Sequence, residues 1–238
     1  MLSFQIMRNA SRSRHQHLRV LPRANSSSRG IVTESIEPPL SSLVREKPCT
    51  LVLVEDQGLY DTSWHSSLRH SLPNEHGLQY CQQTIILSSL VAALSEMTDD
   101  LAMMPSVVLL TRGPVASWVA QYYLESVPLA GLIMVDPVLE PSSELLEELK
   151  SLYSDVAVQE LNLLNRIQSG AESRPYLLEP GVVPMLVLSS INRLQEVSRS
   201  IAHRHSNPSS PFGEVQIGTV ENGDPSELIN DWIEDVVL

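Results

Sequence analysis

Short apolar runs alternate along this chain with segments of helical periodicity, and this alternation constrains the fold more than any other sequence feature. The runs are almost continuous in Val, Leu and Ile, which is typical of strands covered on both faces, as in a parallel sheet. They span residues 50–55, 106–111, 131–135, 183–189 and 215–219, with a weaker run near 78–80. Strands that alternate with helices predict an α/β protein with a doubly wound, mostly parallel sheet.

The segments between these runs carry helix signals. Apolar residues recur at helical spacing in three of them: Trp64, Leu68 and Leu72; Ile86, Leu90, Leu94 and Met97; and Leu145, Leu146, Leu149, Leu152 and Tyr153. A last helix is predicted with Asp224 as its N-cap and Pro225 as its first residue. The stretch from 137 to 180 is longer than one crossover connection needs, so we expect it to hold a small helical cap.

The N-terminal segment differs from the rest in charge. Its first 33 residues contain six arginines and many serines but no acidic residue, a composition typical of a mitochondrial or plastid transit peptide. We therefore expect residues 1–33 to be a cleaved presequence, with the mitochondrion ahead of the plastid as the destination. A disordered basic tail that binds an acidic partner is the alternative. Residues 34–48, with Pro38-Pro39 and Ser41-Ser42, are expected to be a linker, and residues 49–238 the folded domain.

The charge and motif content of this domain exclude several classes of function. Without the six arginines, ten basic residues face 28 acidic ones, and this negative charge argues against nucleic-acid binding. Two cysteines, Cys49 and Cys81, are too few for a disulfide-rich secreted protein or a cysteine-ligated zinc site. No apolar run reaches the ~20 residues of a membrane helix. We expect a soluble, acidic protein without a metal or cofactor, since no GxGxxG, P-loop, HExxH or CxxC motif occurs.

The order of these elements resembles the α/β-hydrolase fold over nearly all of residues 48–238. LVLVEDQG is similar to the early strand and oxyanion loop of that family, and VVLLTRGPVASWVAQYY to its nucleophile strand, elbow and helix. The next strand ends in Val-Asp-Pro at 135–137, VVPMLVLSS resembles the strand before the triad acid, and GEVQIGT the final strand. The resemblance implies an active site built from a Ser, an acid and a His.

The nucleophile position departs from the pattern of the family. The elbow motif is G-x-S-x-G, and here Thr111, Gly113 and Val115 occupy its three fixed positions. Gly113 has no side chain that could attack a carbonyl, whereas glycine followed by Pro114 suits a sharp turn into a helix. Ser117 is the nearest serine, and we expect it to lie within the helix rather than at the turn.

The other catalytic positions also depart. The loop 219–224, where the resemblance implies the catalytic histidine, contains none, and Asn192 stands where the acid is expected. Asp136 could supply a carboxylate from a neighbouring strand end, but its place before Pro137 favours a turn residue. Glu55 and Asp56 would oppose an oxyanion. We expect the remaining histidines to be solvated surface residues: His65, His70, His76, His203 and His205.

These departures favour a protein that is not an enzyme. The leading hypothesis is a non-catalytic α/β-hydrolase-like protein that acts as a binding or structural partner in an organelle, with a protein or a small apolar molecule as its ligand. A divergent hydrolase of small esters or lipids, using Ser117 and Asp136, is the second hypothesis. The third is a small-molecule receptor that uses the former substrate pocket.

Overall fold

The computed structural model describes residues 31–36, 46–56, 63–85, 90–102, 104, 106–137, 180–189, 192–211, 213, 215–220 and 225–237. The strands in this part of the chain are β1 (Ile31–Ile36), β2 (Thr50–Asp56), β3 (Gln79–Ile85), β4 (Val107–Arg112), β5 (Gly131–Val135), β6 (Met185–Ser189) and β7 (Gln216–Thr219). The helices are α1 (Ser63–His76), α2 (Leu90–Leu101), α3 (Pro114–Ser126), α6 (Asn192–His205) and α7 (Ser226–Trp232), which continues into a π-helical turn, η1 (Ile233–Val237).

The seven described strands form one sheet in the order β1-β3-β2-β4-β5-β6-β7. Every neighbouring pair is parallel except β1 and β3, which are antiparallel. The chain moves outward from β2 to β3 on one side and returns to β4 on the other. The predicted doubly wound, mostly parallel α/β sheet is therefore confirmed, and it is an open sheet.

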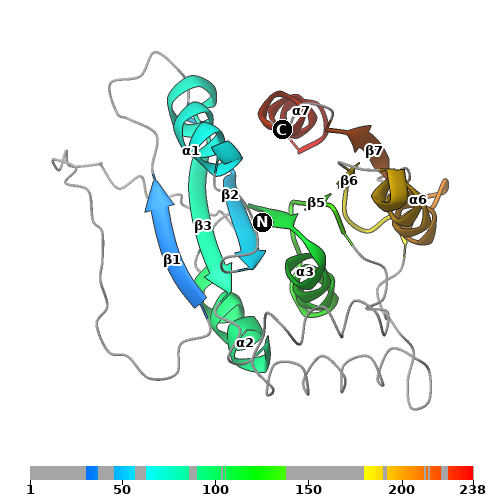
Figure 1. The fold of residues 1–238 in the computed structure, drawn as a ribbon, viewed down its shortest axis with the longest axis horizontal. Helices are drawn as coiled ribbons and strands as arrows, with labels where there is room; N and C mark the ends of the chain where they lie inside the picture. The colour runs from blue at the N-terminus through cyan, green and yellow to red at the C-terminus, as the bar shows by residue number, and fades with distance from the viewer. Residues whose placement is uncertain are drawn as a thin grey trace, which may run out of the picture.

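Helices cover both faces of this sheet, as Figure 1 shows with α1 and α7 on one side and α2 and α3 on the other. Successive strand residues point to opposite faces: Val52 and Val54 pack in a core with helices α2, α3 and α6, whereas Leu51 and Leu53 pack in a second core with α1 and α7. Strands buried in this way have no solvated face, which explains why their sequences lack polar alternation.

Two strands differ from the sequence-based expectation. The weak run near 78–80 is a seven-residue strand, β3, whose polar residues at 82–84 hide it from a hydropathy pattern. Strand β1 lies across the boundary at residue 33 between the predicted presequence and linker, so the sheet takes in residues upstream of Cys49. The expected cap at 137–180 lies mostly outside the described residues.

The ends of the helices follow the predicted signals closely. Helix α3 begins at Pro114, as expected, and α7 begins at Ser226, one residue after the predicted first position. The predicted N-cap Asp224 lies outside the described residues. None of the described helices has the length and apolarity that a membrane crossing requires.

Candidate functional site

The candidate site begins at the turn between β4 and α3, where the sequence predicts a degenerate elbow. Gly113 has φ 91° and ψ 175°, a backbone conformation that is essentially restricted to glycine. Its N–H donates to the carbonyl of Val135 at 3.0 Å, and its own carbonyl accepts the N–H of Ser117 at 3.1 Å. The turn is therefore formed by the backbone of Gly113, and no side chain projects from the position that a nucleophile would occupy.

Ser117 lies one turn into α3, as predicted, and faces the sheet. Its Oγ is 3.1 Å from Oγ1 of Thr111 on β4, and Thr111 also donates to the carbonyl of Ile133 at 3.4 Å. Both side chains are fully buried. This buried hydroxyl pair lies beneath the turn without access to a substrate.

Asp136 follows β5 at the same edge of the sheet. It has φ 51°, a left-handed conformation that is unusual for a residue other than glycine, and its N–H donates to the carbonyl of Leu188 at 2.9 Å. The turn that the sequence predicts at this position is present. Gly113 and Asp136 lie close together because the N–H of Gly113 donates to the carbonyl of Val135, the residue before Asp136. Val115, which stands at the last fixed position of the elbow motif, is the second residue of α3.

A pair of opposite charges lies beside this turn. Glu55, near the end of β2, is 6% exposed, and its register partner on β4 is Arg112. Neighbouring strands are about 4.8 Å apart, so an acidic and a basic residue lie opposite each other at this end of the sheet. Sequence reasoning missed Arg112, although its place at the end of a strand next to β2 was a usable signal.

The position of this pair has a second consequence. The chain leaves β2 toward β3 in one direction and leaves β4 toward β5 in the other, so the pair lies at the switch point of the sheet. In open α/β sheets, ligands bind outside the carboxyl ends of the strands at this point. The residues at this end of β2 and β4 are therefore the described part of the molecule where a ligand would be expected.

Comparison with known proteins finds matches among solved structures alone. No family model matches the chain, and no curated protein sequence matches it. Solved structures do: an esterase from Thermogutta terrifontis superposes with a TM-score of 0.53, at 15% identity over 87% of this chain and 94% of the other. A soluble variant of monoglyceride lipase from Saccharomyces cerevisiae gives a TM-score of 0.59, at 7% identity over 90% and 94% of the two chains.

A third solved structure, the α/β-hydrolase MGS-MChE2 from a sediment metagenome, gives a TM-score of 0.54, at 11% identity over 88% and 97% of the two chains. The chain has the α/β-hydrolase fold. At these identities the similarity describes the fold alone, so the chemistry of this α/β-hydrolase-fold protein has to be judged from its own residues.

The histidines of this α/β-hydrolase-fold chain are only partly as expected. His70 and His203 are exposed, but His205 at the end of α6 is buried, so its prediction as a surface residue is wrong. Burial, together with the smaller effect of the Arg204 charge, lowers the pKa of His205 to about 4. The signal was available, because His205 is four residues after the buried Ile201 and therefore on the same face of the helix.

The positions where the fold usually carries the triad acid and histidine are described only in part. Residues 190–191 and 221–224 lie outside the described residues, while Asn192 begins α6. Beneath this end of β6, Ser189 and Ser198 are fully buried and hydrogen-bonded to each other through their hydroxyls.

Cysteine and metal chemistry find no support in the described part of the chain. Burial raises the pKa of the Cys81 thiol to about 12, with the charge of Asp100 adding to the effect, and burial also raises the pKa of Cys49. Both side chains therefore remain thiols at neutral pH and are poor nucleophiles. Within the same residues, no cluster of three or more His, Cys, Asp or Glu could hold a metal ion.

Proposed function

We propose that this protein is a non-catalytic α/β-hydrolase-like protein that acts as a binding or structural partner in an organelle, the mitochondrion by the composition of its N-terminal segment. One observation carries the proposal: Gly113 occupies the position of the nucleophile and holds a backbone conformation that a serine would adopt only with strain. The chain keeps the turn between β4 and α3 but has no attacking group on it.

The surroundings of Gly113 support the same proposal. Ser117 is fully buried and hydrogen-bonded to Thr111, so it would have to break this bond and leave its position in the core to attack a carbonyl. The carboxylate of Glu55 lies on the strand that leads into the oxyanion loop, where a developing negative charge needs hydrogen-bond donors.

A fluorophosphonate probe tests the proposal directly, because it labels activated serines. The purified protein is expected to remain unlabelled under conditions in which an active serine esterase, treated in parallel, is fully labelled. Labelling that disappears in Ser117→Ala but persists in Ser198→Ala would overturn the proposal and identify the nucleophile. If the proposal is correct, purification from mitochondria should also recover a defined partner at constant stoichiometry.

The second candidate function is hydrolysis of small esters or lipids. It is favoured by the solved structures of the same fold, which include an esterase and a monoglyceride lipase. This candidate predicts turnover of short acyl esters that Ser117→Ala or Asp136→Ala abolishes. Turnover that is unchanged in both variants would remove these residues from any mechanism.

A small-molecule receptor is the third candidate, favoured by the position of Glu55 and Arg112 at the switch point of the sheet. A monoacylglycerol that raises the melting temperature of the wild-type protein, but not of Arg112→Met, would support it. The absence of a shift with monoacylglycerols and short acyl esters would leave the partner protein as the better assignment.

A further inference from the structure

Strand β7 forms one edge of the described sheet, next to β6 (Figure 1). The residues of β5 and β6 are all buried, whereas Gln216, Ile217 and Thr219 of β7 are exposed. Ile217 has 46% of its surface exposed, although large apolar residues of the neighbouring strand, such as Leu188, are fully buried. Strand β7 is therefore not covered as its neighbours are.

The backbone groups of β7 divide between the two sides of the strand. The N–H of Val220, just after β7, donates to the carbonyl of Ser189 on β6 at 3.1 Å. Because successive residues of a strand turn their N–H and C=O groups to opposite sides, Gly218 also faces β6. Ile217 and Thr219 therefore turn their groups to the outer side, where the described sheet has no further strand.

The sequence of this edge lacks the residues that usually keep two edges from pairing. Natural edge strands carry charged side chains, a proline or a bulge for this purpose. Residues 215–220 read VQIGTV and contain neither a charge nor a proline, whereas β1, at the opposite edge, carries Glu34. In a chain with a net charge of −12, the uncharged edge is where a second copy meets the least repulsion.

The outward groups of β7 match those of a second β7 strand that runs in the opposite direction. With a two-fold axis at Gly218, Ile217 of each copy lies opposite Thr219 of the other, and each such pair can exchange two N–H···O bonds. The two Gly218 residues then face each other as a non-hydrogen-bonded pair, with Cα atoms about 4.5 Å apart. Glycine suits this close approach, and a Cβ there would also lie 2.7 Å from Cδ2 of Leu188.

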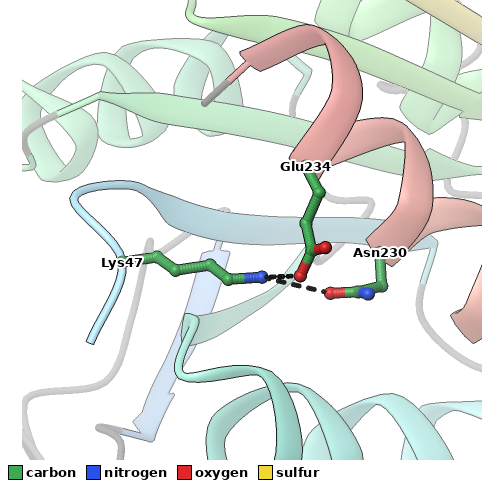
Figure 2. Close-up of polar contacts among 3 residues, drawn as sticks. All are labelled: Lys47, Asn230 and Glu234. Carbon is green, nitrogen blue, oxygen red and sulfur yellow. Dashed lines mark hydrogen bonds and ion pairs between the residues drawn. The ribbon is translucent and has the colours of Figure 1, made fainter. Parts of the chain in front are cut away.

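The C-terminal helix leads away from this edge. Trp232 of α7 packs against Gly131 at the start of β5, where a Cβ would lie 2.9 Å from the ring. Beyond it, Glu234 accepts a hydrogen bond from Nζ of Lys47 at 2.5 Å, and Asn230 accepts a second one at 3.4 Å, as Figure 2 shows. Lys47 precedes β2, near the centre of the sheet, so these contacts hold α7 over the sheet and leave the outer side of β7 uncovered by it.

We propose that two copies of this chain associate through their β7 strands, which pair antiparallel about Gly218 and join the two sheets into one. A basic or acidic peptide finds no opposite charge on residues 215–220, whereas a second copy offers the matching set of backbone groups. An edge of four residues is short, so the dimer is expected to form reversibly as the protein concentration rises. The proposal does not depend on the function proposed for the Gly113 turn.

Sedimentation equilibrium of the purified full chain tests the association. The mass is expected to rise with protein concentration from the 26.4 kDa of one chain toward twice that value. Ile217→Lys places a charge on the edge and should keep the mass of one chain. Leu228→Lys puts the same charge on the exposed face of α7 and should associate as the wild type does. A wild type with the mass of one chain at every concentration would overturn the proposal, and so would equal masses of the two variants.

Two variants at Thr219 test the pairing of the backbone itself. Thr219→Pro removes an N–H that faces outward and leaves the bonds between β7 and β6 in place. Thr219→Val keeps this N–H and loses only the hydroxyl, which accepts a hydrogen bond from Gln195. The proline variant is expected to stay a monomer, with the far-UV circular dichroism of the wild type, and the valine variant to associate. Equal association of both variants would overturn the proposal.

Hydrogen exchange followed by NMR locates the interface residue by residue. The amide protons of Ile217 and Thr219 should exchange more slowly in concentrated than in dilute protein, because they are bonded only in the dimer. The amide of Gly218 faces β6 and should exchange at the same rate in both samples. Rates at Ile217 and Thr219 that do not change with concentration, in a protein whose mass does, would place the interface elsewhere and overturn the proposal.

Discussion

The β4–α3 and β6–α6 units of this molecule each contain a buried hydrogen bond between two hydroxyl groups. In each, a hydroxyl at the end of the strand is hydrogen-bonded to a serine of the helix: Thr111 to Ser117 at 3.1 Å, and Ser189 to Ser198. All four side chains are fully buried. Each pair joins a strand to the helix that covers it and satisfies two polar groups within an apolar core.

The two units differ in the residues that surround this hydroxyl pair. The β4–α3 unit has the Gly113 turn, at the position where the α/β-hydrolase fold carries its nucleophile, whereas the β6–α6 unit ends in the buried His205. Because Ser198 makes the same contact as Ser117 without being near an elbow, the contact is a packing feature. A serine in the helix after an elbow is therefore weak support for catalysis unless it is exposed at the turn.

The largest expected difference between the two units is in how low pH affects the stability of the protein. The folded-state pKa of His205 is about 4, below the ordinary value of 6.5 for histidine, so protonation favours the unfolded chain. The neutral His205 stabilises the folded protein fully above pH 6.5. This contribution to the free energy of unfolding, about 3 kcal/mol in total, is lost as the pH falls toward 4. Urea unfolding of the wild type and His205→Gln between pH 4 and 7.5 measures this loss as the difference between the two curves.

The exposed His203 supplies the control for this experiment. The variant His203→Gln should follow the wild-type curve, because the side chain of His203 is exposed. If His205→Gln and His203→Gln have the same pH dependence, His205 is not buried as described. The β4–α3 unit would then no longer differ from β6–α6 in its response to acid.

The Gly113 turn should be the most sensitive point of the β4–α3 unit at neutral pH. Gly113→Ala and Gly113→Ser are each expected to lower the free energy of unfolding by about 1–3 kcal/mol, since both place a Cβ on a backbone that favours glycine. Equal losses, measured by urea unfolding at pH 7.5, would assign the effect to the backbone. A fully stable Gly113→Ser would contradict the conclusion that the backbone of this turn requires glycine.

The two hydroxyl pairs should respond alike. Ser117→Ala and Ser198→Ala each leave a buried partner without its hydrogen bond, which costs about 1–3 kcal/mol. Thr111→Val/Ser117→Ala removes both polar groups and should cost less than the sum of its single variants, which a double-mutant cycle measures. A loss of esterase turnover in Ser117→Ala without any loss of stability would separate the two serines and favour the hydrolase.

The sequence predicted those parts of the fold in which burial alone decides the structure. The run 131–135 coincides with β5, and the Gly113-Pro114 turn begins α3 as its residues indicate. Strands β1 and β3 were missed or underestimated because their polar residues become strand through pairing with each other, which no local pattern records. The proximity of Arg112 to Glu55 and the burial of His205 likewise depend on register and helix packing.

The smallest expected effects on the free energy of unfolding are those of substitutions at Asp136, whose backbone can be compared with that of Gly113. Both residues are left-handed, at φ 51° and 91°, and both N–H groups bond to the next strand. Asparagine tolerates this conformation about as well as aspartate, so Asp136→Asn should change the free energy of unfolding by less than about 0.5 kcal/mol, whereas Asp136→Ala should cost about 1 kcal/mol. Urea unfolding of the three proteins decides between a turn residue and a carboxylate with another role. A large loss in Asp136→Asn would show that the charge is required, and would return Asp136 to the list of groups that a hydrolase mechanism could use.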